Sequence, residues 1–171
     1  NNLNNMNFLK IKNFLLLFLI IFSYLISVAK TYAVDITADR TISSSSDGDQ
    51  YNIKTNNDID VIVTNNSTLE RNQKIFNVSA ASLTGSSITI HLGSSVIAET
   101  NSIFSNGAEL TITNTGTIEA TNSKAINVSN SDGVSITNNN NGVIKSNNNT
   151  ILGDAGTGAD NVTIDNSGEI Y

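Results

Sequence analysis

A short unit of alternating residues recurs along the chain and constrains the fold more than any other feature. It reads apolar-x-apolar, then Thr-Asn or a similar pair, then a turn and a further apolar residue. Its clearest copies are 110–118 (LTITNTGTI) and 162–170 (VTIDNSGEI), and the other copies lie at 134–144, 61–69 and 88–97. Their last apolar residues are separated by 28, 21, 26 and 26 residues. Such self-similarity is typical of repeat architectures.

The alternation within each unit predicts β-strands. In Leu110-Thr111-Ile112-Thr113, both apolar side chains fall on one face of a strand and both hydroxyls on the other. Each unit except the last is followed by a second apolar pair: Ile75-Phe76, Ile103-Phe104, Ala125-Ile126 and Ile151-Leu152. Each repeat therefore holds about three short strands.

One repeat of this kind cannot bury its own apolar face, whereas stacked repeats share a continuous core. We therefore predict an all-β fold, a parallel β-helix of about five coils with 21–28 residues each, over residues 55–171. Equivalent asparagines would form a hydrogen-bonded ladder at one corner: Asn65, Asn114, Asn138 and Asn166. Ile112, Ile136 and Ile164 would form an inward aliphatic stack. An antiparallel β-sandwich of short strands is the alternative.

The first 33 residues have the three-part pattern of a secretory signal peptide. Lys10 and Lys12 precede a thirteen-residue apolar run, 14–26, which is shorter than the roughly 20 residues that span a bilayer. We predict a helical signal peptide over 1–33 with cleavage after Ala33; cleavage after Ala29 and an uncleaved anchor are alternatives. Residues 34–54 are expected to form an N-terminal cap or a flexible lead-in.

Composition excludes several classes of function. The absence of cysteine rules out disulfides and thiolate metal sites. Residues 34–171 hold six basic and fifteen acidic residues, a formal net charge of −9. An acidic surface repels nucleic acid and anionic lipid, so we expect neither as a partner.

A search for catalytic and metal-binding motifs finds little. The only histidine, His91, falls at an outward strand position, which indicates a surface imidazole. Residues 155–162 match most of the calcium-binding nonapeptide G-G-x-G-x-D-x-U-x, with Asp160 as the candidate ligand. A second copy is needed to complete such a site, so we expect a plain turn and no cofactor.

The remaining charged and hydroxyl residues suggest no active site either. Arg71 and Lys74 are the closest basic pair, and we interpret them as solubilising residues of a loop. Asp58 and Asp60 would share a strand face, where they would be solvated or bind a cation weakly. Outward threonines occur, but they show no regular T-x-T column in the sequence: Thr89, Thr111, Thr113 and Thr163.

The segments 112–118 (ITNTGTI) and 160–170 (DNVTIDNSGEI) resemble the passenger repeats of bacterial autotransporters, as does the Gly- and Asp-rich loop 152–160. The resemblance covers residues 55–171. It implies a right-handed β-helix displayed outside a Gram-negative cell and held in the outer membrane by a C-terminal barrel that lies beyond this sequence. We therefore expect the chain to be the N-terminal part of a longer passenger.

These observations favour a non-enzymatic, exported surface protein at the cell surface, outer membrane or outside the cell. Its role would be that of an adhesin or display stalk, including a virulence adhesin, that contacts host or environmental surfaces and glycans through many weak interactions. The alternatives are a secreted carbohydrate-active β-helix enzyme, similar to polysaccharide lyases or hydrolases, and a surface-layer or ice-binding solenoid.

Overall fold

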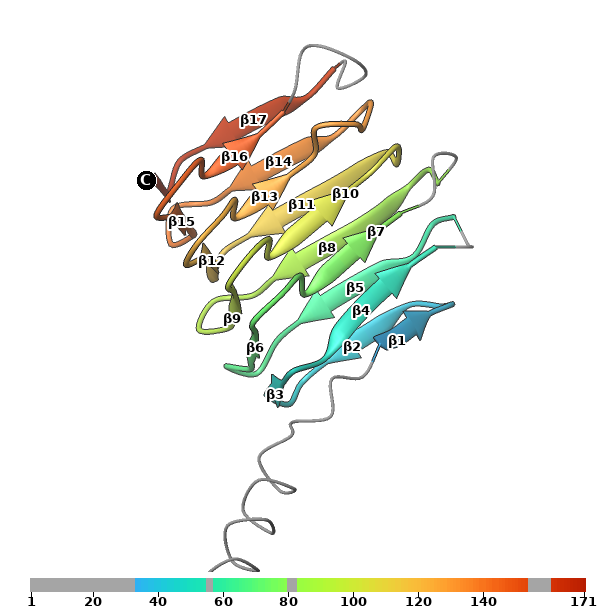
Figure 1. The fold of residues 1–171 in the computed structure, drawn as a ribbon, viewed down its shortest axis with the longest axis horizontal. Helices are drawn as coiled ribbons and strands as arrows, with labels where there is room; N and C mark the ends of the chain where they lie inside the picture. Colours follow the sequence, from blue (N-terminus) through green and yellow to red (C-terminus); the bar gives the residue numbers. More distant parts are fainter. Residues whose placement is uncertain (1–32, 55–56, 80–82, 154–160) are drawn as a thin grey trace, which may run out of the picture. The chain divides into compact units, whose positions relative to one another are not determined.

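The computed structural model describes residues 33–54, 57–79, 83–153 and 161–171. All regular secondary structure in these ranges is β, in eighteen short strands (Figure 1). The predicted signal segment lies outside the described residues except for Ala33, which is the first residue of β1.

The strands form three parallel six-stranded sheets, and every third strand along the chain belongs to the same sheet. Sheet A contains β1 (Ala33–Ile36), β4 (Gln50–Ile53), β7 (Phe76–Val78), β10 (Ile103–Ser105), β13 (Ile126–Asn127) and β16 (Ile151–Leu152). Sheet B contains β2 (Arg40–Ile42), β5 (Asp60–Val63), β8 (Ser86–Ile90), β11 (Leu110–Asn114), β14 (Ser135–Asn138) and β17 (Thr163–Asn166). Sheet C contains β3 (Ser46–Asp47), β6 (Thr68–Arg71), β9 (Ser95–Ala98), β12 (Thr117–Ala120), β15 (Val143–Ser146) and β18 (Glu169–Ile170).

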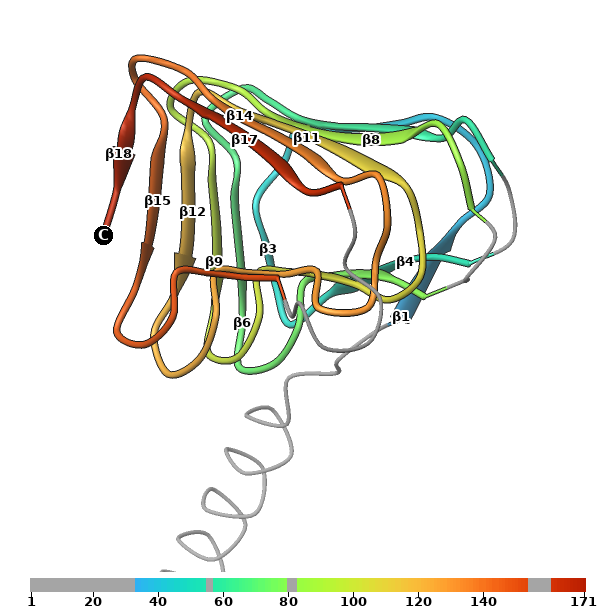
Figure 2. The ribbon, with the colours of Figure 1, turned by 90° about the horizontal axis from the view of Figure 1, so that it is seen from above.

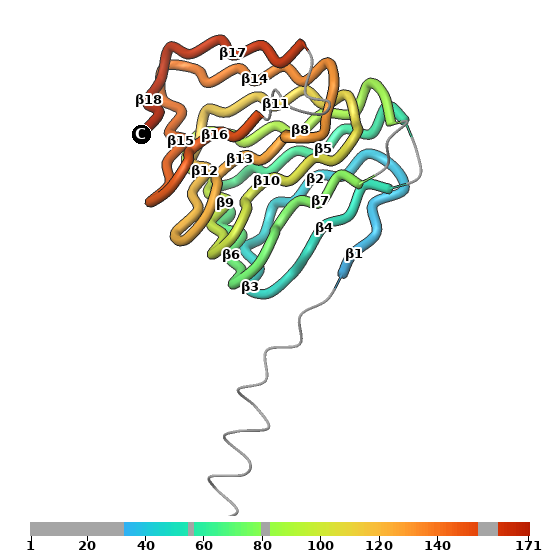
Figure 3. Tube along the Cα trace, turned by 45° about the horizontal axis from the view of Figure 1, so that its top comes forward, coloured from blue at the N-terminus to red at the C-terminus, as the bar shows by residue number. Residues whose placement is uncertain are grey.

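This topology is that of a parallel β-solenoid with three sides, one for each sheet (Figure 2). Strands of the same sheet lie side by side along the stack, as the Cα trace shows (Figure 3). The chain makes five full turns between β1 and β16, so the predicted fold class of about five coils is confirmed. All the strand pairs of the three sheets are parallel, which argues against the antiparallel sandwich.

The solenoid begins earlier than the repeats in the sequence suggest. Residues 34–54, which we expected to form a cap or a lead-in, contain strands of all three sheets. Ile36 and Ile53 pair in register and are both buried. The first coil therefore belongs to the same core as the later ones.

The core is a stack of aliphatic side chains, because the inward residues of each strand lie over those of the next coil. Ile112 pairs with Ile136, and both are fully buried. Ile164 continues this stack in β17 but remains 49% exposed, since no described coil covers it. An aromatic contact in the core joins Tyr51 to Phe76, whose ring centroids are 5.6 Å apart.

Two apolar residues lie one position away from where the repeat pattern places them. Leu69 pairs with Val96, so Val96 occupies the inward position and Ile97 points outward. Phe76 pairs with Ile103, so Phe104 also points outward. A shift of one residue moves a side chain to the opposite face of a strand. The two repeat intervals that meet at Ile97, of 28 and 21 residues, are therefore each wrong by one residue, because Val96 holds the equivalent position.

An asparagine ladder occupies the corner between sheets B and C in the last three coils. The Asn114 Nδ2 atom donates to Asn138 Oδ1 at 2.8 Å, and Asn138 Nδ2 donates to Asn166 Oδ1 at 2.8 Å. Asn114 and Asn138 are fully buried, so these bonds satisfy amides that would otherwise be costly to bury.

Asn65 does not join this ladder. The residues of β5 and β8 in register with Asn114 are Val63 and Ile90. Asn65 lies two residues beyond Val63, exposed in a tight turn with a φ of 58°. Asparagine tolerates this left-handed conformation, so the same residue type serves a different purpose in the earlier coil.

Glycine is required beside the ladder because the backbones approach each other closely there. A Cβ atom on Gly142 would overlap Asn138 Oδ1 and lie 2.6 Å from the Asn114 carbonyl oxygen. Each ladder asparagine is followed by such a glycine, two residues later in Asn114–Gly116 and Asn166–Gly168 and four residues later in Asn138–Gly142, at a corner without room for a side chain.

Candidate functional site

The outward face of sheet A carries a row of side chains, one from each coil. In-register pairing aligns Asp35, Asn52, Asn77, Phe104, Asn127 and Leu152. Adjacent coils are about 4.8 Å apart, so neighbours in such a row can bond to each other directly. The row combines one carboxylate and three amides with one aromatic ring and one leucine, a composition suited to polar ligands that also have apolar surface.

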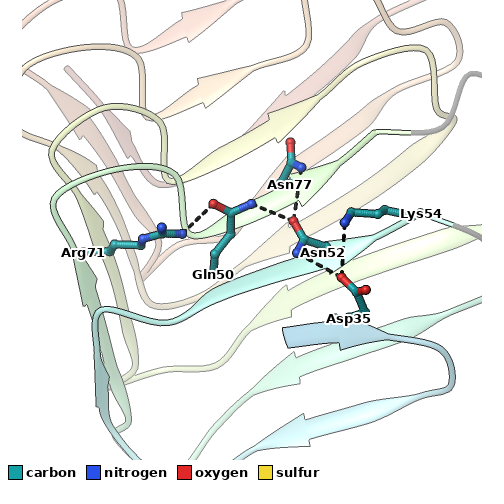
Figure 4. Close-up of polar contacts among 6 residues, drawn as sticks. All are labelled: Asp35, Gln50, Asn52, Lys54, Arg71 and Asn77. Carbon is teal, nitrogen blue, oxygen red and sulfur yellow. Dashed lines mark hydrogen bonds and ion pairs between the residues drawn. The ribbon is translucent and has the colours of Figure 1, made fainter. Parts of the chain in front are cut away.

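A hydrogen-bonded network holds the first half of this row in place (Figure 4). Arg71 Nη1 donates to Gln50 Oε1 at 2.5 Å, and Gln50 Nε2 donates to Asn52 Oδ1 at 2.6 Å. The same Asn52 oxygen accepts from Asn77 Nδ2 at 3.2 Å, while Asn52 Nδ2 donates to Asp35 Oδ1 at 3.1 Å. Asn52 is only 2% exposed although it lies on the outer face, because these neighbours cover it. The network therefore orients Gln50 and Asn77 before any ligand arrives.

An ion pair closes the network at the first coil. Lys54 Nζ lies 3.3 Å from Asp35 Oδ1, and both side chains are largely exposed. The hydrogen bond from Lys54, followed by that from Asn52, lowers the pKa of Asp35 below 3.8. Asp35 therefore stays ionised at neutral pH and remains an acceptor for the amide of Asn52.

A groove of about 360 Å³ lies beside the network, lined by Gln50, Gln73, Lys74, Asn77 and Thr100. The lining contains three amides, one hydroxyl and one ammonium, but no carboxylate. Lys74 Nζ lies 3.5 Å from the centroid of the Phe104 ring, a cation–π contact. Partial burial lowers the pKa of Lys74, because the charged form loses hydration.

Arg71 is a strand residue, in contrast to our interpretation of the sequence, whereas Lys74 lies in the turn between β6 and β7, as that interpretation has it. Arg71 ends β6, and its Nη1 atom donates to the Lys74 carbonyl oxygen at 2.9 Å as well as to Gln50. Its Nε atom is buried without a hydrogen-bond partner, and burial lowers the pKa of the guanidinium, partly offset by Asp49. Arg71 therefore stabilises the turn that presents Lys74.

A second hollow, of about 350 Å³, lies on the other side of Arg71 along sheet C. It is acidic, because Asp47, Glu70 and Glu99 contribute to its lining. In the described part of the chain, no three His, Cys, Asp or Glu residues are grouped so that they could hold a metal ion. We regard the groove at Lys74 as the stronger candidate site, because its polar groups are mutually oriented.

The outward face of sheet B carries two rows of mostly hydroxyl side chains. One row aligns Ser87, Thr111, Ser135 and Thr163, and the other aligns Thr89, Thr113 and Thr137. As expected from the sequence, the threonines form no regular T-x-T column. Only β11 has threonine in both rows, because Ser87, Ser135 and Asp165 hold one of the two positions in β8, β14 and β17.

The other residues singled out in the sequence lie apart from the groove. His91 is exposed just after β8, and its Nδ1 atom lies 3.1 Å from Thr64 Oγ1. Asp58 and Asp60 are both exposed, and Asp60 accepts from Ser87 Oγ at 2.6 Å. Asp160, the candidate calcium ligand, lies outside the described residues.

Sequence reasoning missed Gln50, Asn52 and Asn77, although a signal for two of them exists. An asparagine stands between two buried apolar residues in Tyr51-Asn52-Ile53, Phe76-Asn77-Val78 and Ile126-Asn127-Val128. This recurring pattern predicts a row of outward amides on one sheet. The contribution of Gln50 and Arg71 has no comparable signal, because it depends on how two coils meet.

Comparisons with known proteins leave the family open: the chain matches no protein-family model, no curated protein and no solved structure. No helix in the described ranges is long and apolar enough to cross a membrane. The fold and the groove geometry therefore define a β-solenoid with a polar outer face.

Proposed function

We propose that this protein is an exported, cell-surface β-solenoid that binds glycans through the outer face of sheet A, in the manner of an autotransporter-like adhesin. The observation that carries the proposal is the network in which Arg71, Asn52 and Asp35 orient the amides beside the groove. Oriented amides both donate and accept hydrogen bonds, as sugar hydroxyls do, and preorganisation reduces the entropic cost of binding.

The solenoid itself supports a binding role over a catalytic one. Its sheets are continuous and parallel, so equivalent side chains recur at intervals of about 4.8 Å along the stack. A polymer lying along the row can make several weak contacts at once, and such contacts add up to useful avidity. The apolar run of 14–26 with its flanking lysines supports export.

Glycan binding is tested by screening the full chain on an array of neutral and acidic oligosaccharides. We expect binding that is lost in Asn77→Leu, which removes an amide at the groove, and kept in Asn140→Leu, which changes an exposed asparagine elsewhere. Equal binding by both variants, or no binding to any glycan, would contradict the proposal.

Export is tested separately by expressing the chain in a Gram-negative host and fractionating the cells. We expect the protein outside the cytoplasm, with a mature N-terminus at Val34 by Edman sequencing. A cytoplasmic protein that keeps residues 1–33 would contradict this part of the proposal.

The hydroxyl rows on sheet B favour a second candidate function, adsorption to a solid with a repeating surface, such as ice or a crystalline polysaccharide. The rows repeat in two directions, along each strand and from coil to coil. Thermal hysteresis of the solution, abolished by Thr113→Lys, is the expected result for ice. Its absence, together with no adsorption to crystalline cellulose or chitin, would remove this candidate.

A further inference from the structure

We propose that the groove at Lys74 binds the carboxylate of an acidic sugar residue. The proposal rests on the glycan-binding function above and specifies the class of ligand for that site. Its basis is an ammonium group that lies in a polar groove without an acidic partner.

Among the residues that the structure describes, Lys74 has no carboxylate partner, in contrast to Lys54 and Lys145. The ion pairs within the described ranges join Lys54 to Asp35 and Lys145 to Glu119, and neither includes Lys74. Its groove contains no carboxylate, and its side chain is only partly exposed. A partly buried cation is stabilised by an anion more than by remaining solvent, so the groove has a specific preference for negative charge.

The chemistry around Lys74 suits a sugar rather than a small inorganic anion. The Phe104 ring does not line the groove, but its face contacts the ammonium and positions it beside the groove amides. Asn77 uses its Nδ2 group to bond Asn52, and its oxygen points away from that contact (Figure 4). One ligand with a carboxylate and hydroxyls can engage both Lys74 and Asn77.

The preference for negative charge belongs to the groove alone, because the protein as a whole is acidic. The chain has a formal net charge of −6, so the protein as a whole repels anions. Binding of an acidic glycan therefore depends on the groove itself. It is expected to weaken as salt screens the contact with Lys74.

The test measures affinity of the full chain for two acidic probes and their neutral counterparts by calorimetry. The probes are 3′-sialyllactose against lactose, and trigalacturonate against its carboxyl-reduced form. We expect at least one acidic probe to bind about tenfold or more tightly than its counterpart, the range of a charge-assisted hydrogen bond. The two pairs distinguish a terminal acidic sugar from one within a polymer.

Lys74→Met keeps the side-chain length and removes the charge, and Lys145→Met is the matched control. We expect Lys74→Met to abolish the preference for the acidic probe while binding of the neutral counterpart persists. Lys145→Met is expected to keep the preference. Circular dichroism establishes that both variants are folded.

The experiments distinguish a failure of the carboxylate assignment from a failure of glycan binding. Equal affinity for acidic and neutral probes, or an unchanged preference in Lys74→Met, would overturn the carboxylate assignment and leave glycan binding standing. No binding to any of the four probes, together with no binding on the glycan array, would overturn both proposals.

Discussion

Phe76 lies in register with Ile103 and not with Phe104. The two phenylalanines follow an isoleucine in the same way in the sequence, yet Phe76 is fully buried against Tyr51 and Phe104 lies on the outer face under Lys74. A difference of one residue in strand register therefore places one phenylalanine in the core and the other on the surface.

Alanine substitutions of these two residues should have very different effects on stability. Phe76→Ala leaves a cavity in the core and should lower the free energy of unfolding by about 3–5 kcal/mol. Phe104→Ala removes a partly exposed ring and its contact with Lys74, at about 1–2 kcal/mol. Urea denaturation followed by circular dichroism measures both, and similar midpoints for the two variants would contradict the observed register.

The asparagine ladder should contribute measurably to stability. Asn138→Ala removes the acceptor of Asn114 and the donor to Asn166, and it leaves the buried amide of Asn114 with fewer partners. We expect a loss of about 1–3 kcal/mol in the free energy of unfolding. Asn140→Ala, at an exposed loop position, is the control and should change stability by less than about 0.5 kcal/mol.

The last described coil should tolerate substitutions that the interior does not. Ile136 and Ile164 hold equivalent inward positions, but Ile136 is fully buried and Ile164 is 49% exposed. Ile136→Ala should cost about 2–5 kcal/mol and Ile164→Ala about 1 kcal/mol. An equal loss in both variants would show that Ile164 is covered in solution, and sedimentation velocity at increasing concentration would reveal whether a second molecule covers it.

The pairing of Asp35 should appear in its titration. Lys54 and Asn52 lower the pKa of this carboxyl in the folded state, so its contribution to stability is present above pH 3.8 and is lost as the pH falls through the folded pKa. Carbon-13 NMR of the side-chain carboxyl should give a midpoint below 3.8, which Lys54→Met raises. Lys145→Met should leave that midpoint unchanged, because Lys145 pairs with Glu119 instead.

The fold was predictable because its main determinant is periodic. The pattern Leu110-Thr111-Ile112-Thr113 identifies a strand and its two faces, and its recurrence identifies the stack. The pattern fails where a coil changes length: it selects Ile97 instead of Val96, because both are apolar and the register depends on the turn before them.

The candidate site was much less predictable. Gln50 and Arg71 are 21 residues apart and meet because the end of one strand of sheet C lies beside the start of a strand of sheet A in the preceding coil. Local sequence patterns do not predict such a contact. Lys74 resembles a loop residue in the sequence, and only its position over the Phe104 ring distinguishes it.

The ladder has a consequence for how the gene can change. Asn114, Asn138 and Asn166 occupy equivalent positions, and the amides of Asn114 and Asn138 each donate to the asparagine of the next coil in the same geometry. Deletion of one whole coil would bring Asn114 opposite Asn166 with the same partners, and duplication of a coil would add one more identical step. We therefore expect the gain or loss of a coil here to preserve the ladder, so that the length of the solenoid can change without a new packing problem at this corner.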